Sequence, residues 1–161
     1  MFTGIIAEWL FSNRRDRIWE RETKTFSYFG DGTTQWICTT VDDLAAYTIE
    51  AVSAPEAEKG GFIRVESFRF TPAELVAAYE RARGPGVKGH LKCEGSLEDV
   101  VAMLSKARET TDPIDHDQYI GLSYAEHVLK GSWDYEAVDC RRFPNVKQTS
   151  LEEYFKAHPE L

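Results

Sequence analysis

The segment QWICTTVDDLAAYTIEAV, residues 35–52, indicates the fold class most clearly, because a strand pattern passes directly into a helix pattern. Residues 35–39 carry Trp36 and Cys38 and are typical of a short strand. From Val41 onward, mostly apolar side chains recur at intervals of three, four, seven, eight and eleven residues, which predicts one stripe of an amphipathic helix. The stripe consists of Val41, Leu44, Ala45, Thr48, Ile49 and Val52.

Two adjacent carboxylates, Asp42 and Asp43, fall in the first turn of this predicted helix. Paired carboxylates can act as a general acid and base, but the dipole of a helix also favours carboxylates in its first turn. We interpret the pair as part of the helix start, because this position accounts for both carboxylates and no catalytic role is needed to explain them.

Other strands and helices surround this segment in mixed order. Strands are predicted at residues 24–29, 62–68 and 88–94, and helices at residues 71–83, 96–110 and 115–130 and from residue 150 onward. The quartet Thr71-Pro72-Ala73-Glu74 is typical of a capping box with proline in the first helical turn. The order predicts a mixed α/β (α+β) fold with a few short strands and about five helices, not a clean βαβ repeat.

The N-terminal residues 3–13 are rich in large apolar side chains and read as a short, partly buried helix or a helix-like loop. This segment either seals the core or lines an apolar pocket, and its composition does not separate the two. Residues 14–17 (RRDR) then predict a polar surface stretch.

Composition excludes several classes of protein. The chain has 161 residues, of which 42% are hydrophobic, which predicts a single domain over residues 1–161. Its 19 Lys and Arg against 27 Asp and Glu give a net charge of −8, so we expect no nucleic-acid partner. No apolar run approaches the roughly 18 residues of a membrane span, so no membrane partner is expected. Three scattered cysteines and the absence of a basic leader predict a reducing, cytoplasmic setting.

Two motifs resemble functional sites but have simpler interpretations. Residues 84–89 (GPGVKG) match the letters of a dinucleotide fingerprint, but a predicted helix precedes them and a strand follows, so we interpret them as a helix-to-strand connector. Asp112, Asp115, His116 and Asp117 could suggest a metal site, but Asp residues also cap helices, and we predict no metal here. No Cys–His pair or serine motif stands out as catalytic.

Four stretches, in this order and over nearly the whole chain, resemble the C-terminal half of the NmrA-like and isoflavone-reductase-like family, which are atypical short-chain dehydrogenases. They are residues 3–10 (TGIIAEWL), residues 30–32 (GDG) with 41–44 (VDDL), residues 62–65 (FIRV) with 71–75 (TPAEL), and residues 143–154 (FPNVKQTSLEEY). The resemblance implies the C-terminal, substrate-side portion of an NAD(P)-binding Rossmann-type fold.

The resemblance also implies functional residues. Members of this family carry an N-terminal Rossmann half that binds NADP through a glycine-rich loop, and in the reductases a catalytic lysine lies in that half or at its edge. By resemblance, Gly4 and Ile5 would border the cofactor, while Ile6, Trp9 and His127 would border the substrate. The resemblance implies no catalytic residue and no metal ligand in this chain.

The sequence therefore predicts the substrate-side fragment of an NAD(P)-dependent oxidoreductase that acts on small aromatic or phenylpropanoid-like compounds. The alternatives are a non-catalytic, redox-sensing regulator of the NmrA type and a small-ligand-binding or dimerising module. Because no diphosphate grip is present, we expect this chain alone to be inactive and to bind NADP weakly or not at all. Its partner would be a missing N-terminal half or a second copy, and apolar faces near Trp9 and Trp36 would be left uncovered.

Overall fold

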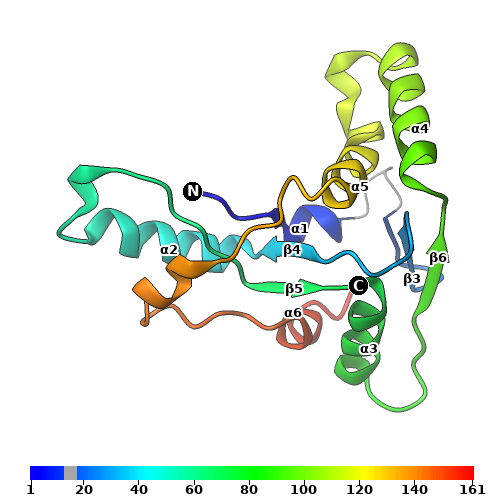
Figure 1. Cartoon of the computed structure of the whole chain (residues 1–161). Coiled ribbons are helices and arrows are strands. Elements are labelled where there is room, and N and C mark those ends of the chain that lie inside the picture. Colours follow the sequence, from blue (N-terminus) through cyan, green and yellow to red (C-terminus); the bar gives the residue numbers. More distant parts are fainter. Residues whose placement is uncertain (13–17) are drawn as a thin grey trace.

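The computed structural model describes residues 1–12 and 18–161 and confirms the mixed α/β fold class (Figure 1). In these residues the strands form two three-stranded sheets, with the orders β1-β4-β5 and β2-β3-β6. The first sheet contains β1 (Ile5–Ile6), β4 (Trp36–Thr39) and β5 (Phe68–Phe70), with β1 parallel and β5 antiparallel to β4. The second contains β2 (Trp19–Glu20), β3 (Thr25–Tyr28) and β6 (His90–Cys93), with β2 antiparallel and β6 parallel to β3.

Helices connect and flank the strands. The α-helices are α1 (Ala7–Leu10), α2 (Val41–Ser53), α3 (Pro72–Arg83), α4 (Leu97–Thr110), α5 (Ile120–Leu129) and α6 (Leu151–Ala157), and the 3₁₀ helices are η1 (Ala57–Lys59), η2 (Pro113–Gln118) and η3 (Val138–Arg142). In Figure 1, α2 extends to one side as an arm, α4 and α5 stand together on the other side, and α3 lies against α6. Within the described ranges, no helix combines the length and the apolar character that crossing a membrane requires.

Three predicted elements differ from the structure. The strand predicted at residues 62–68 is wrong, because β5 begins only at Phe68 and Arg64 makes a single bridge to Phe2. The helix predicted at residues 115–130 is divided, since Asp112 caps the 3₁₀ helix η2 and Asp115 leaves helical φ and ψ. Residues 3–13 contain the strand β1 as well as the helix α1; Asn13 and the polar stretch 14–17 lie outside the described residues.

An aromatic cluster forms the centre of the core. The ring of Trp19 lies 5.1 Å from that of Tyr79, and the ring of Phe155 lies 5.3 Å from those of Phe11 and Tyr79. All four side chains are buried, so the cluster joins the end of α1 to β2, α3 and α6. Such ring pairs add about 0.5–1.5 kcal/mol each beyond the burial of their area.

Trp36 belongs to the same core. Its ring lies 5.4 Å from that of Phe26, and only 3% of the residue is exposed. The expectation of an uncovered face around Trp36 is therefore wrong, because the second sheet covers it. Trp9, by contrast, is 53% exposed.

A buried carboxylate fixes α2. The Asp43 carboxylate, in a residue that is 5% exposed, accepts hydrogen bonds from the Ser67 hydroxyl (2.5 Å), the Thr149 backbone N–H (2.8 Å) and the Thr149 hydroxyl (2.9 Å). Tyr47, one turn further on, is also buried. The helix therefore turns its Asp43 face inward, and the apolar stripe from Val41 to Val52 lies mostly on the outer side, where Ile49 is 65% exposed.

Capping boxes begin three of the helices. In α3, α4 and α6 the N-cap hydroxyl accepts from the third backbone N–H, and the third carboxylate accepts from the N-cap backbone N–H. In α6 these residues are Ser150 and Glu153, and Lys147 lies 3.4 Å from the same carboxylate. The hydrogen bonds from the Ser150 backbone and hydroxyl, together with Lys147, lower the pKa of Glu153 to about 2.

The first testable consequence concerns Asp43. Replacing Asp43 with Asn puts an amide N–H₂ beside the Ser67 and Thr149 donors, so we expect the free energy of unfolding to fall by about 2–4 kcal/mol. Urea denaturation at neutral pH measures this loss. Asp42→Asn is the matched control, because Asp42 lies in the same turn but is exposed, and it should change stability by no more than about 0.5 kcal/mol. Equal effects of the two substitutions would contradict the role given to Asp43.

The second consequence concerns pH. Because the pKa of Glu153 is lowered from 4.5 to about 2 on folding, the cap of α6 contributes fully above pH 4.5 and is lost as the pH falls toward 2. NMR titration of the Glu153 carboxyl carbon checks the value. Ser150→Ala removes the hydroxyl but keeps the backbone N–H, so it should move the pKa part of the way back toward 4.5. Lys147→Ala should move it less, because the Ser150 hydroxyl contributes more than Lys147. A normal pKa in the unsubstituted chain would contradict this account.

Candidate functional site

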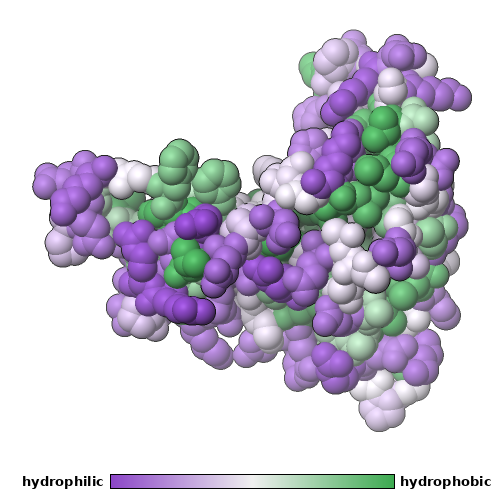
Figure 2. All heavy atoms as spheres, in the orientation of Figure 1, coloured by the Kyte–Doolittle hydropathy of each residue, from purple (hydrophilic) through white to green (hydrophobic). Residues whose placement is uncertain are grey.

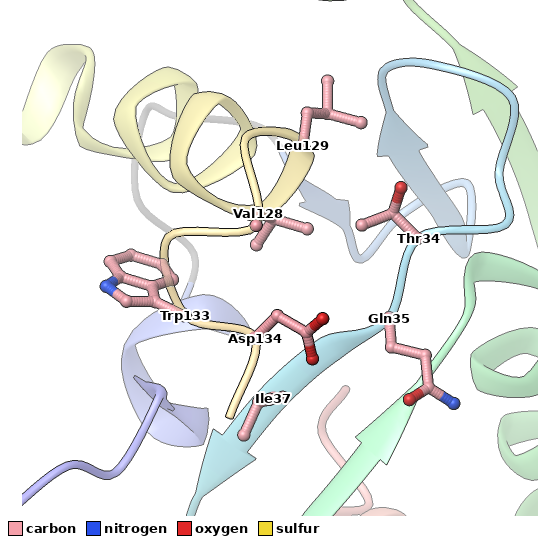
Figure 3. A pocket seen from close by; sticks show the side chains of 8 residues that line it. Thr34, Gln35, Ile37, Val128, Leu129, Trp133 and Asp134 are labelled. Carbon is pink, nitrogen blue, oxygen red and sulfur yellow. The ribbon is translucent and has the colours of Figure 1, made fainter. Parts of the chain in front are cut away.

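A cavity of about 220 Å³ lies between the C-terminal end of α5 and the segment that enters β4 (Figure 3). Its lining residues are Thr34, Gln35, Ile37, Val128, Leu129, Gly131, Trp133 and Asp134. Figure 3 shows Asp134 across the cavity from Thr34 and Gln35, with Val128 and Leu129 along the helix side. Apolar walls with a few polar groups that converge from different elements are typical of small-molecule sites.

The turn after α5 positions the aromatic wall. Gly131 has φ +65°, a conformation that glycine adopts without strain, and its N–H donates to the Val128 carbonyl at 3.0 Å. The chain then reverses, and the ring of Trp133 lies 5.8 Å from Tyr124 and 5.3 Å from His127 on α5. The helix end therefore holds Trp133 against the cavity.

A second glycine turn positions the opposite wall. Gly30, between β3 and β4, has φ +79°, and a Cβ at this residue would lie 2.8 Å from Leu129 Cδ2. Asp31 accepts hydrogen bonds from the hydroxyl (2.7 Å) and backbone N–H (2.9 Å) of Thr33, and these bonds lower the pKa of Asp31. The turn thereby carries Thr34 close to the end of α5.

The N-terminal residues predicted to border cofactor and substrate lie at different depths. Gly4, with φ +63°, lies against Ile37 of the cavity wall, because an added Cβ would overlap the Ile37 carbonyl oxygen and approach Ile37 Cγ2 to 2.9 Å. Ile5 is buried in the core and Ile6 is half-buried in β1. Trp9 lies on the surface of α1. The structure thus brings only Gly4 close to the cavity, and the roles of these four residues stay predictions.

His127 does not line the cavity itself but contacts Trp133, which does. Its Nδ1 lies 2.9 Å from the Ser123 carbonyl oxygen, and its ring packs on Trp133. The sequence reasoning named His127 but missed Trp133 and Asp134, which line the cavity themselves. The partial signal is Gly131 at the end of a helical pattern, since a glycine there ends the helix and reverses the chain just before Trp133 and Asp134.

The junction of β4 with α2 resembles a phosphate site but is already occupied. β4 leads into α2, whose N-terminus would attract an anion. The Glu8 carboxylate takes this place, because both of its oxygens lie 3.1 Å from the Val41 backbone nitrogen. A diphosphate at this helix end would meet a carboxylate, so the N-terminus of α2 does not fit the grip of a dinucleotide.

The motifs set aside in the sequence have structural explanations. Gly84 ends α3 and the strand β6 follows, so the interpretation of residues 84–89 as a helix-to-strand connector is confirmed. Asp112 accepts a hydrogen bond from the Ile114 backbone N–H at 3.0 Å and caps η2. In residues 1–12 and 18–161, no three or more His, Cys, Asp or Glu side chains are grouped to hold a metal ion.

Comparison with known proteins confirms the predicted resemblance. An isoflavone reductase homolog from Nicotiana tabacum is 24% identical over 160 residues, covering 96% of this chain and 51% of the homolog. A phenylcoumaran benzylic ether reductase from Populus trichocarpa is 26% identical over 128 residues, covering 79% of this chain and 41% of that protein. No family model matches the chain.

Solved structures show the same fold. The leucoanthocyanidin reductase–NADPH complex from Vitis vinifera matches with a TM-score of 0.69 at 17% identity, over 96% of this chain and 50% of that one. An isoflavone reductase structure matches with a TM-score of 0.68 at 22% identity, again over 96% and 50%. The chain therefore spans about half the length of the proteins it matches, and its fold is that of a part of these reductases.

The contact between Gly30 and Leu129 yields a testable prediction. Gly30→Ala should lower the free energy of unfolding by about 2–3 kcal/mol, because it adds a clash with Leu129 to the strain of a positive φ. Gly86→Ala is the matched control: its φ is +88°, nothing lies within 4 Å of its Cβ position, and we expect about 1 kcal/mol. Chemical denaturation measures both. Adding Leu129→Ala to Gly30→Ala should remove the part of the stability loss that comes from the clash. A double-mutant cycle that shows no coupling between these two positions would contradict the contact.

Proposed function

We propose that this chain forms the substrate side of an NAD(P)-dependent reductase that acts on small aromatic, phenylpropanoid-like compounds. The observation that carries the proposal is the cavity beside Trp133, in a chain whose relatives are named as reductases of isoflavones, phenylcoumaran benzylic ethers and pinoresinol. A half-buried indole beside aliphatic side chains favours an aromatic ligand, since aromatic rings pack well against one another.

Each wall of the cavity has a separate task in this proposal. Trp133 packs against the aromatic ring of the substrate, and Val128 and Leu129 exclude water from its edge. The Asp134 carboxylate accepts a hydrogen bond from a ring hydroxyl, while Thr34 and Gln35 offer polar groups on the opposite side. These residues bind and orient the substrate.

The cofactor belongs to another part of the enzyme in this proposal. NADPH, when bound, supplies the hydride of such reductions. The Glu8 carboxylate at the start of α2 opposes a diphosphate there, so this chain by itself supplies no step that involves the nucleotide. The proposal therefore limits the role of the chain to substrate binding.

Binding of coniferyl alcohol, measured by ligand-observed NMR, tests the proposed site. Trp133→Leu should weaken binding about tenfold, because the ring loses its aromatic contact. Phe62→Leu is the matched control, since Phe62 is 82% exposed and lies outside the cavity. Cinnamyl alcohol, which lacks the ring hydroxyl and methoxy groups, should bind more weakly than coniferyl alcohol. Asp134→Asn should reduce the part of this preference that comes from the hydroxyl, because only the hydroxyl donates a hydrogen bond to the carboxylate. Equal effects of the Trp133 and Phe62 substitutions would contradict the proposal that the substrate binds in this cavity.

NADPH titration of the same chain tests whether the nucleotide binds to another part of the enzyme. We expect no saturable binding at micromolar concentrations and no reduction of coniferyl alcohol by the chain alone. Saturable binding of NADPH would contradict the assignment of the nucleotide to another part of the enzyme. NADPH binding without reduction, after assembly with that part, would favour a redox-sensing regulator.

A further inference from the structure

A second cavity, of about 500 Å³, lies beside η3 and contains a thiol that the proposed function does not use. Cys140 on η3 lies on its wall together with Gln148, and Cys140 is only partly buried. Figure 2 shows mostly hydrophilic side chains over η3 and the segment that follows it. The Cys140 thiol is therefore open to a small, water-soluble reagent.

The sulfur of Cys140 has one acceptor and one donor beside it. The thiol donates to the Glu66 carbonyl oxygen at 3.7 Å, and the side-chain amide of Gln148 donates to the sulfur at 3.3 Å. The same amide nitrogen donates to the Glu66 carbonyl oxygen at 2.7 Å, which fixes the direction of the amide. An amide N–H thus points at a sulfur atom, which in a thiol is only a weak acceptor.

A buried hydroxyl lies beside the same sulfur. Tyr47 on α2 is 0% exposed and forms a cluster with Val65 and Phe143, against which Cys140 also packs. Burial, together with the neighbouring Cys140 thiol, raises the pKa of the Tyr47 hydroxyl, so the hydroxyl keeps its proton and can donate it. Within residues 1–12 and 18–161, the hydroxyl oxygen has no hydrogen-bond partner of normal geometry. Buried hydroxyls are normally paired, so this one calls for a stronger acceptor than a thiol.

The two donors suit an oxygen atom bonded to the Cys140 sulfur. A sulfenic acid carries such an oxygen, and an oxygen accepts hydrogen bonds more strongly than the sulfur of a thiol. We propose that Cys140 is a site of oxidation by a hydroperoxide, with the Tyr47 hydroxyl and the Gln148 amide as the groups that hold the added oxygen. The same donors hold an oxygen of the incoming peroxide, so they act on the rate of the reaction as well as on its product.

The reaction is a two-electron oxidation of the sulfur. The thiol gives its proton to solvent, and the sulfur attacks one oxygen of hydrogen peroxide. The S–O bond forms as the O–O bond breaks, and the leaving hydroxide takes up a proton to become water. The sulfur is oxidised and the peroxide is reduced, so the step needs no further reactant.

The two other cysteines differ from Cys140 in their surroundings. Cys38 is buried, and burial raises the pKa of its thiol, which makes it a poor nucleophile. Cys93 on β6 is exposed, and its thiol is directed to the carbonyl oxygens of Gly30 and Gly95, at 3.5 Å and 3.6 Å. Cys93 is therefore the matched control within the same chain, because it is more accessible than Cys140 and its thiol faces acceptors.

Trapping of the sulfenic acid with dimedone tests the proposal. The full chain is treated with hydrogen peroxide in the presence of dimedone, and mass spectrometry of its peptides gives the labelling rate of each cysteine. We expect Cys140 to be labelled at least about tenfold faster than Cys93, although Cys93 is the more exposed thiol. Labelling of Cys140 that is no faster than that of Cys93 would overturn the proposal.

Tyr47→Phe tests the hydroxyl alone. The hydroxyl has no partner in the reduced chain, so its removal should leave the thermal unfolding midpoint unchanged or slightly higher. The substitution should slow dimedone labelling of Cys140 about fivefold and leave that of Cys93 unchanged. Alkylation of Cys140 by iodoacetamide, which adds no oxygen to the sulfur, should change by less than about twofold. An equal loss in both reactions would show that the substitution acts on access to the thiol, and would overturn the role given to the hydroxyl.

Gln148→Leu provides a second variant, and because Gln148 is exposed the substitution should leave the fold intact. It removes the other donor, so it should also slow dimedone labelling of Cys140 about fivefold, again without an effect on Cys93. Oxidation of Cys140 at the unsubstituted rate in both variants would contradict the proposed site.

Discussion

The buried carboxylate of Asp43 is the interaction that determines the placement of α2. It receives three hydrogen bonds from Ser67 and Thr149, and these residues belong to the segment before β5 and the segment before α6. A buried carboxylate with too few donors would cost several kcal/mol, so the helix can adopt only the rotation that meets all three. That rotation turns the side of α2 that carries Asp43 and Tyr47 toward the protein and most of the apolar stripe from Val41 to Val52 away from it.

Close approaches at glycines fix the cavity in a similar way. Gly30 and Gly4 have positive φ and lie where a Cβ would meet Leu129 or Ile37, which both line the cavity. Gly131 reverses the chain after α5 and presents Trp133. The polar network at Asp43 and these turns lie in a chain that has a cavity of about 220 Å³, β1 at a sheet edge and a carboxylate at the N-terminus of α2. The chain spans about half the length of the reductases it matches.

The sequence predicted the structure correctly where the interacting residues lie close together along the chain, and less well where they lie far apart. The capping box at Thr71, the helix that starts at residue 150 and the connector at residues 84–89 were predicted correctly, because the residues that determine them lie within a few positions of one another. The strand predicted at residues 62–68 was wrong, because the segment before Phe68 pairs with Phe2 at the far end of the chain. Trp133 and Asp134 were missed, because their role depends on where the turn before β4 lies.

The amino-acid sequence was sufficient to establish which residues form most helices and strands, where several helices begin, and that the chain resembles a part of the isoflavone-reductase-like proteins. Three-dimensional packing was needed to establish which side of α2 faces the core and which residues meet at the cavity. The physical reason is that helical periodicity gives the separation of the two faces of a helix and not the direction of its neighbours. That direction is set by contacts such as those of Asp43 with Ser67 and Thr149, which are 24 and 106 residues away along the chain.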